Sequence, residues 1–142
     1  MKIVAILFVI LLTATPSHAA VLAKAGLAGG AFRISGALGR NIGERFAVVS
    51  EIGHGNAPSY SVTTLGVSIK APVALNIYAG LGVNYSNYSD AVDLPFGGKI
   101  TERSGAGFGA FVGAQLRETV FVQAGYDTRL GGIAEAGYRV RK

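Results

Sequence analysis

Few residues of the 142-residue chain are suited to chemistry. His54 is the one histidine beyond the N-terminal segment, and a histidine base needs a nucleophile or a second titratable group within hydrogen-bond reach. Paired carboxylates suited to acid–base work do not stand out, and no Cys/His cluster or acidic loop is typical of a metal site. The sequence therefore predicts no catalytic residue, no metal, no cofactor and no enzyme.

Two further motifs have a plain structural interpretation. The glycine run GAGFGAFVG at 105–113 resembles a phosphate-binding loop, but such a loop requires a following helix and this run continues as a strand. The repeated Asn-Tyr-Ser at 84–86 and 87–89 matches the glycosylation sequon, and it is interpreted here as a polar strand end and loop. Neither motif adds a site.

Seven charged residues share one side of an alternating pattern with Gly, Ser, Thr and Asn. Their signs are mixed, as an internal ion-pair network requires. We expect them to form a polar network inside the molecule: Lys24, Arg33, Glu51, Lys70, Asp127, Glu135 and Arg139.

The N-terminal segment has the layout of a secretory signal peptide. Lys2 precedes the apolar run 3–14, and Ser17 and Ala19 fit the small-residue cleavage rule. We expect residues 1–19 to be the signal peptide and 20–142 to form one domain. An N-terminal membrane anchor is the alternative, but the run is shorter than the roughly 20 apolar residues of a spanning helix. The absence of cysteine excludes a lipoprotein and a disulfide scaffold.

The remaining chain is apolar and only mildly basic. Removing Lys2 from the 13 basic and 8 acidic residues leaves a net charge of +4, and the charges are scattered. No basic cluster interleaved with aromatic residues indicates a nucleic-acid partner. All 21 glycines lie after residue 19. An exported apolar chain without a helical span needs another architecture.

That architecture is indicated by a period of two. In 73–86, VALNIYAGLGVNYS, every second residue from Val73 is apolar, which is typical of a strand with two different faces. Strands are predicted over 21–28, 31–40, 46–53, 60–70, 73–87, 106–116, 120–128 and 133–140. The turn-forming breaks between them lie at 29–30, 40–45, 54–59, 71–72, 89–105, 117–119 and 129–132.

Two barrel architectures share this alternation, and charge separates them. A soluble barrel of the lipocalin type would turn its apolar face inward and cover the outside with many charges. Here the polar face is mostly small residues, which suit a narrow interior better than a solvent coat. We therefore predict an all-β, eight-stranded antiparallel up-and-down transmembrane barrel. On this assignment Leu81→Arg should impair membrane insertion, and Gly80→Ser should be milder.

Loop lengths support the same assignment. Bacterial barrels have short periplasmic turns and longer outer loops, so the connection 89–105 should lie outside and 40–45, 71–72 and 117–119 at the periplasmic side. Aromatic residues with lipid-facing parity should form girdles at the two interfaces. The outer group is Phe32, Tyr85, Phe108 and Tyr126, and the periplasmic group is Phe46 and Tyr138.

Over the whole of 20–142, the pattern resembles the small eight-stranded outer-membrane barrels of the OmpA/OmpX type. The resemblance rests on the signal peptide, the alternating strands and the closing strand GIAEAGYRV. In that family the last strand commonly ends in an aromatic residue read by the assembly machinery, and Tyr138-Arg139-Val140 stands at that place. The resemblance implies an outer-membrane location, a lipid bilayer with outer-leaflet lipid as surroundings, and the assembly machinery as a partner.

Function is then expected to be structural or surface-interactive, for a monomer with a lumen filled by side chains. Loop 89–105 would contact a host or surface partner through Phe96, Lys99, Glu102 and Arg103. The main alternative is a soluble secreted or periplasmic barrel that binds an apolar ligand. A third, a lipid-modifying enzyme, is disfavoured because the lipid A deacylases with this barrel use His-x-Ser, whereas this chain has His54-Gly55-Asn56.

Overall fold

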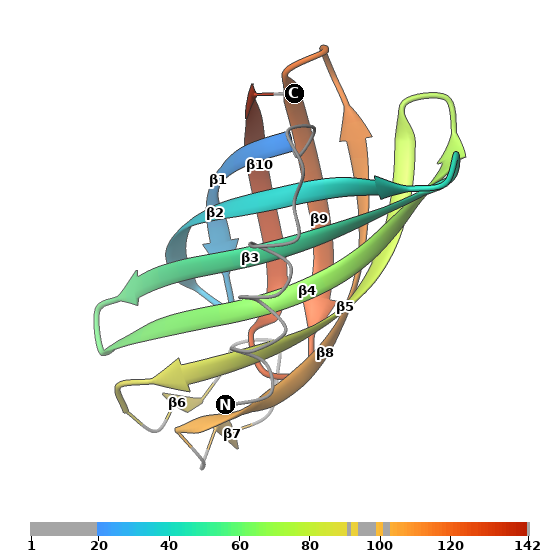
Figure 1. The fold of residues 1–142 in the computed structure, drawn as a ribbon. Coiled ribbons are helices and arrows are strands. Elements are labelled where there is room, and N and C mark those ends of the chain that lie inside the picture. The colour runs from blue at the N-terminus through green and yellow to red at the C-terminus, as the bar shows by residue number, and fades with distance from the viewer. Residues whose placement is uncertain (1–19, 91, 94–98, 101–102, 142) are drawn as a thin grey trace.

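The computed structural model describes residues 20–90, 92–93, 99–100 and 103–141, and ten strands lie within them (Figure 1). The expected signal peptide, 1–19, lies outside the described residues. The strands are β1 (Ala20–Ala28), β2 (Ala31–Ile42), β3 (Phe46–Ala57), β4 (Tyr60–Ala74), β5 (Ile77–Tyr88), β6 (Val92–Asp93), β7 (Lys99–Ile100), β8 (Ser104–Gln115), β9 (Val120–Asp127) and β10 (Gly131–Arg141).

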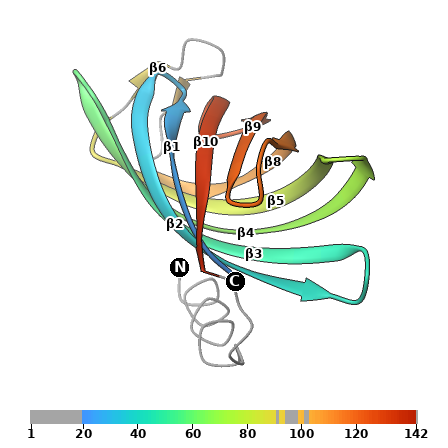
Figure 2. The same ribbon diagram turned by 90° about the horizontal axis from the view of Figure 1, so that it is seen from above.

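Eight of these strands close into one antiparallel barrel in the order β1-β10-β9-β8-β5-β4-β3-β2. Figure 2 shows the strands curving around a common interior. Ala25 of β1 pairs with Ile34 of β2 on one side and with Ala136 of β10 on the other, which closes the sheet. Closure removes both sheet edges, so the backbone groups of the wall are satisfied without water. The predicted eight-stranded up-and-down barrel is confirmed, including its first strand.

The barrel has two distinct ends. At the terminal end, β1 begins and β10 ends, with Val21 paired to Arg141; the turns at 43–45, 75–76 and 116–119 lie at the same end. At the loop end are the turns at 29–30, 58–59 and 128–130 and the long connection 89–103, which carries the β6-β7 pair. The one long connection therefore lies at the end opposite the two chain termini, as the sequence predicts, and the turns at the terminal end are all short.

The break predicted at 71–72 is wrong. β4 runs on to Ala74, with Pro72 opposite Tyr78 and a register shift between Pro72 and Ala74. Proline is tolerated there because a bulge near a strand end does not need its missing N–H. The chain reverses at 75–76 instead, where Asn76 adopts φ 60°, a conformation that asparagine tolerates better than most residues. The regular alternation of 73–86 therefore spans two strands.

The break predicted at 54–59 is also too long. β3 extends to Ala57, so only Pro58 and Ser59 connect it to β4. Gly55 faces the lumen, where a Cβ would lie 3.1 Å from Cγ1 of Val62. This glycine therefore reflects crowding inside the barrel, although its neighbours make the segment look like a turn.

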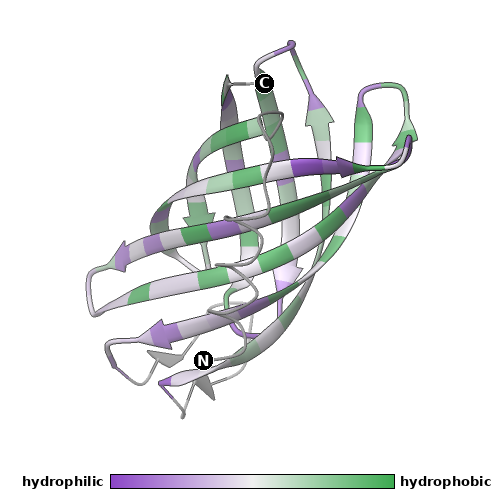
Figure 3. Ribbon diagram, viewed as in Figure 1, coloured by the Kyte–Doolittle hydropathy of each residue, from purple (hydrophilic) through white to green (hydrophobic). Residues whose placement is uncertain are grey.

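The outer face of the barrel is a belt of exposed apolar side chains. Leu81 is 65 % exposed and Phe108 is 67 % exposed, and both point away from the lumen. On β4 the outward residues from Leu65 to Val73 are all apolar, a length close to the roughly 9–11 residues that a tilted strand needs to cross a bilayer. Figure 3 shows the alternation of hydrophobic and hydrophilic residues along the strands. Such a belt is typical of a transmembrane barrel.

No helix among the described residues is long and apolar enough to span a membrane.

Candidate functional site

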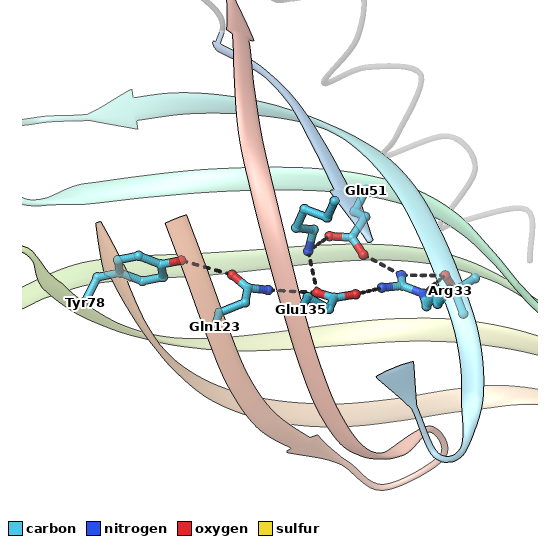
Figure 4. Close-up of polar contacts among 7 residues, drawn as sticks. Arg33, Glu51, Tyr78, Gln123 and Glu135 are labelled. Atoms are coloured by element: carbon cyan, nitrogen blue, oxygen red, sulfur yellow. Dashed lines mark hydrogen bonds and ion pairs between the residues drawn. The ribbon is translucent and has the colours of Figure 1, made fainter. Parts of the chain in front are cut away.

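Four charged side chains from four neighbouring strands meet in the middle of the lumen (Figure 4). Nζ of Lys24 lies 3.1 Å from Oε2 of Glu135, and Nη1 of Arg33 donates to Oε1 of Glu135 at 2.5 Å. Lys24 and Arg33 also form ion pairs with Glu51. We call these four residues, Lys24, Arg33, Glu51 and Glu135, the ionic cluster.

Strand register places the cluster. Gly26 of β1 pairs with Arg33 of β2 and with Glu135 of β10, so the arginine and the glutamate flank one glycine in the same row. Space for the guanidinium comes from Gly53 of β3, where a Cβ would lie 2.7 Å from Nη2 of Arg33. Glycines next to the long side chains of Arg33 and Glu135 therefore leave enough space for these charged groups inside a narrow barrel.

Neutral polar side chains complete the cluster. Nη2 of Arg33 donates to Oγ1 of Thr64 at 2.7 Å. Nε2 of Gln123 donates to Oε2 of Glu135 at 3.0 Å, and the hydroxyl of Tyr78 donates to Oε1 of Gln123 at 3.1 Å (Figure 4). Thr64, Gln123 and Tyr78 were not among the residues predicted from the sequence. Their inward parity was the available signal, since they alternate with outward apolar residues.

The cluster is electrically balanced, with two cations and two carboxylates that are buried or nearly so. Burying an ion is unfavourable unless it is paired and hydrogen-bonded. Each member here has at least two charged partners. The loss of one member would therefore leave an uncompensated charge in the middle of the barrel.

The other three predicted network residues lie in the lumen but outside the cluster. Asp127 is buried and accepts from Nδ2 of Asn84 at 3.1 Å and from the backbone N–H groups of Arg129 and Leu130 at 2.8 and 3.0 Å. Its role is to cap the β9-β10 turn. Lys70 lies over the rings of Tyr78 and Phe121, 4.8 and 5.7 Å from their centroids.

Arg139, the last of the seven, lies on β10 toward the terminal end. The structure thus brings four of the seven predicted residues into direct contact and places the other three outside that cluster.

Apolar layers lie on both sides of the cluster. Toward the loop end, the buried residues Ala28, Val62, Tyr88 and Leu130 pack together with Tyr60 and Ile133. Toward the terminal end, Leu22, Ala37, Val49 and Phe121 pack with Ala20 and Tyr78. A cavity of about 110 Å³ remains beside the cluster, large enough for a few water molecules. The lumen is therefore filled mainly by side chains.

Arg129 holds the loop-end layer in place, and it could not be assigned to the lumen from the sequence because it falls in the predicted break 129–132. Its Nε donates to Oγ of Ser86 at 2.8 Å, and its Nη2 donates to the carbonyl of Arg103 at 3.3 Å. Its guanidinium lies 5.8 Å from the ring centroid of Tyr88, whose hydroxyl donates to the Arg129 carbonyl at 2.6 Å. The turn between β9 and β10 is thereby held across the mouth.

The predicted girdle residues all have outward parity. Phe32, Phe108 and Tyr126 are exposed and Tyr85 is half-buried on the loop-end side, and Phe46 and Tyr138 are exposed near the terminal end. Their heights follow from the register, since Phe32 pairs with Asn56 near the end of β3, whereas Tyr138 pairs with Val120 at the start of β9.

Of the predicted loop contacts, Phe96 and Glu102 lie outside the described residues. The backbone of Lys99 pairs with Asp93 in the β6-β7 hairpin. Arg103 is exposed, and its carbonyl accepts from the backbone N–H of Tyr88 at 2.7 Å.

The sequence predicts His54 to lie in a loop, and this is wrong. The residue lies within β3 and its side chain points outward. Its Nδ1 lies 3.0 Å from Oγ1 of Thr63 on β4, an exposed contact. No carboxylate among the described residues completes a catalytic arrangement there, and no group of three or more potential metal ligands was found among them.

Comparisons with known proteins concern the fold. No protein-family model matches the sequence, and no curated protein matches it. A solved structure described as a de novo designed transmembrane β-barrel is similar with a TM-score of 0.57 at 12 % identity, covering 89 % of this chain and 98 % of that one. Neisserial surface protein A is similar with a TM-score of 0.49 at 19 % identity, covering 87 % of this chain and 94 % of that one. By its strand order, apolar exterior and likeness to the designed barrel, this chain has the fold of a small eight-stranded transmembrane β-barrel.

Proposed function

We propose that this protein is a bacterial outer-membrane barrel with a closed lumen, which acts through its loop end and is neither a channel nor an enzyme. The observation that carries the proposal is the inverted distribution of polarity. Large apolar side chains are exposed around the wall, whereas Arg33 and Glu135 are 4 % and 6 % exposed inside it. Lipid is the surrounding in which this arrangement is favourable, because a basic residue moved to the lipid face costs roughly 2–4 kcal/mol at the midplane.

The same distribution disfavours a soluble barrel that binds an apolar ligand. Such a barrel would need an apolar interior, and here the interior contains an ionic cluster with polar partners. Its outside would also expose a continuous apolar surface far larger than soluble monomers show.

A closed lumen is supported by the three layers along the axis, in which apolar residues lie on both sides of the ionic cluster. Eight strands leave room for side chains and little else. An ion that entered would have to displace paired charges. We therefore expect no sustained conductance from the protein in planar bilayers.

The loop end is the proposed contact surface. The connection 89–103 is the longest in the barrel and contains its own short hairpin, in which Val92 pairs with Ile100. Loops supported by a rigid wall are a common place for binding residues. Phe96, Lys99, Glu102 and the exposed Arg103 are the proposed contacts with a partner at the cell surface.

Membrane fractionation tests the proposal. The wild-type protein should be found in outer membranes and should migrate differently on detergent gels before and after boiling, as closed barrels do. Leu81→Arg should reduce the amount of folded protein in the membrane several-fold, because Leu81 faces lipid. Leu81→Ala is the matched control, since it removes the same side chain without adding charge.

Release of the wild-type protein as a monomer into detergent-free buffer would contradict the membrane location. Stepwise channel openings in planar bilayers would contradict the closed lumen and leave the location standing.

A further inference from the structure

The terminal end of the lumen contains positive charge that the ionic cluster does not neutralise. A hollow of about 360 Å³, here called the terminal vestibule, is lined by Ala20, Arg40, Asn41, Ala47, Lys70 and Arg139, among others. Each of its charged lining residues is a cation. Lys70 reaches it from β4 and Arg139 from β10, so the two cations come from separate parts of the wall.

No carboxylate among the described residues pairs with these two cations. Glu51 and Glu135 already bind Lys24 and Arg33, and neither Lys70 nor Arg139 forms an ion pair within the described part of the chain. The charged groups that act on Lys70 are Arg139 and Lys24, and both repel it. The side chain of Lys70 rests instead against the rings of Tyr78 and Phe121.

Arg139 supplies a second, independent observation. Its Nε is buried and has no hydrogen-bond acceptor among the described residues. A buried donor without an acceptor is unfavourable, and more so when it belongs to a charged group. The wall therefore holds a guanidinium with one unsatisfied buried N–H beside a second cation, an arrangement that an anion would complete.

We propose that the terminal vestibule binds a phosphate-class anion between Lys70 and Arg139. A guanidinium presents parallel N–H donors that match two oxygens of such an anion, and a lysine ammonium adds a compact positive charge. Asn41 lines the same hollow and carries a further amide donor. The anion has two sources, free phosphate from the aqueous side or the headgroup of a phospholipid at the interface marked by Phe46 and Tyr138.

Calorimetric titration of the protein purified from membranes in maltoside micelles, which contain no phosphate, tests the proposal. Inorganic phosphate should bind saturably to the wild type, and Arg139→Gln and Lys70→Met should each weaken binding by at least roughly tenfold. Arg45→Gln removes an equal charge from the exposed turn 43–45 and should change binding by less than about twofold. Absence of saturable binding, or equal weakening by Arg45→Gln, would overturn the proposal.

Thermal unfolding followed by circular dichroism separates a binding role from a structural one. Without phosphate, Lys70→Met and Arg139→Gln should raise the unfolding temperature, because each removes one of two mutually repelling charges. A purely structural residue would lower it. Phosphate should then raise the unfolding temperature of the wild type clearly more than that of either variant, since the stabilisation by a ligand falls as its affinity falls. Equal stabilisation of wild type and variants would contradict the site.

The two sources are distinguished by a second titration in the same micelles with a short-chain phosphatidylglycerol. Tighter binding than inorganic phosphate, lost in Arg139→Gln, would identify a lipid headgroup as the ligand. Binding equal to or weaker than that of inorganic phosphate would identify the free anion. Failure of both ligands would reject the vestibule as an anion site while leaving the proposed closed barrel intact.

Discussion

Two regions of the lumen are filled by opposite means. The ionic cluster comes from β10, β1, β2 and β3 and consists of long charged side chains that satisfy one another. The second region, which we call the aromatic row, consists of Tyr78, Phe111 and Phe121 from β5, β8 and β9. Tyr78 and Phe111 meet edge to face, with centroids 6.2 Å apart.

Each ring of the aromatic row lies over a glycine directly opposite it on the neighbouring strand. The pairs are Tyr78 with Gly113, Phe111 with Gly80, and Phe121 with Gly137. A Cβ on these glycines would lie only 2.1–2.2 Å from a ring carbon. The ring replaces the missing side chain of the glycine, a device also used to support glycines in designed sheets.

The difference between the regions lies in what each one tolerates. The ionic cluster depends on charged side chains that neutralise one another, so removing one of them should destabilise the barrel. The aromatic row depends on glycines that leave space for the rings, so adding a side chain to one of these glycines should destabilise the barrel. Gln123 joins the two regions, since it bonds Glu135 on one side and Tyr78 on the other.

Deleting one charge from the ionic cluster should have the largest effect. Arg33→Met would leave Glu51 and Glu135 with Lys24 alone, and breaking a buried pair in this way costs about 3–5 kcal/mol. Urea unfolding of the refolded barrel in lipid vesicles would measure the loss. The charge-matched double variant Arg33→Met/Glu135→Gln keeps the Lys24–Glu51 pair, so it should lose less than the single variant. A double variant that loses more would indicate that repulsion is not the cause.

Adding atoms to the aromatic row should have an intermediate effect. In Gly80→Ser the new Cβ would lie 2.2 Å from Cζ of Phe111, so the ring must move within a packed lumen. Overpacking of this kind costs about 1–3 kcal/mol, so we expect a loss that is not negligible but is still milder than that of Leu81→Arg. Gly36→Ser makes the same change on the outer face and is the control for added atoms without crowding, because a Cβ there meets nothing within 4 Å.

Combining Gly80→Ser with Phe111→Leu tests the mechanism in the same unfolding assay. The smaller side chain should relieve the crowding, so the double variant should be more stable than the sum of the single effects implies. Strict additivity would show that the ring and the glycine are not coupled.

Cutting the link between the regions should have the smallest effect. Tyr78→Phe removes the hydroxyl that donates to Gln123 and leaves the ring over Gly113, so we expect a loss of about 0.5–1.5 kcal/mol. Tyr85→Phe on the outer face is the control and should be nearly neutral. If Tyr78→Phe destabilised the barrel as much as Arg33→Met, the two regions would have to be treated as one network.

The sequence predicted the features that follow from alternation. Successive residues of a strand point to opposite faces, so the alternation alone assigns Arg33 and Glu135 to the polar face. The structure places every predicted network residue on the luminal side. Polar partners such as Gln123 were missed because contacts between strands depend on register, which no single strand reveals. Register is also why the sequence could not tell that Lys70 and Arg139 are separate from the ionic cluster.

Turns were predicted less well, because Gly and Pro have two uses in this chain. Gly55 falls in a predicted turn, but it makes space for Val62 in the lumen. Pro72 falls in a predicted break, but it lies at a bulge within β4. The true reversal depends on the backbone of Asn76, a residue in the middle of an otherwise regular alternation.

The seam between the first and last strands has a consequence for assembly. Glu135 is on β10, whereas its partners Lys24 and Arg33 are on β1 and β2, so these ion pairs join residues from opposite ends of the chain. Lys24 and Arg33 can pair with Glu51 before the barrel closes, but Glu135 can meet its two partners only when β10 joins β1. A chain cut short before β10 would therefore lack both the closure and the charge that balances the second cation.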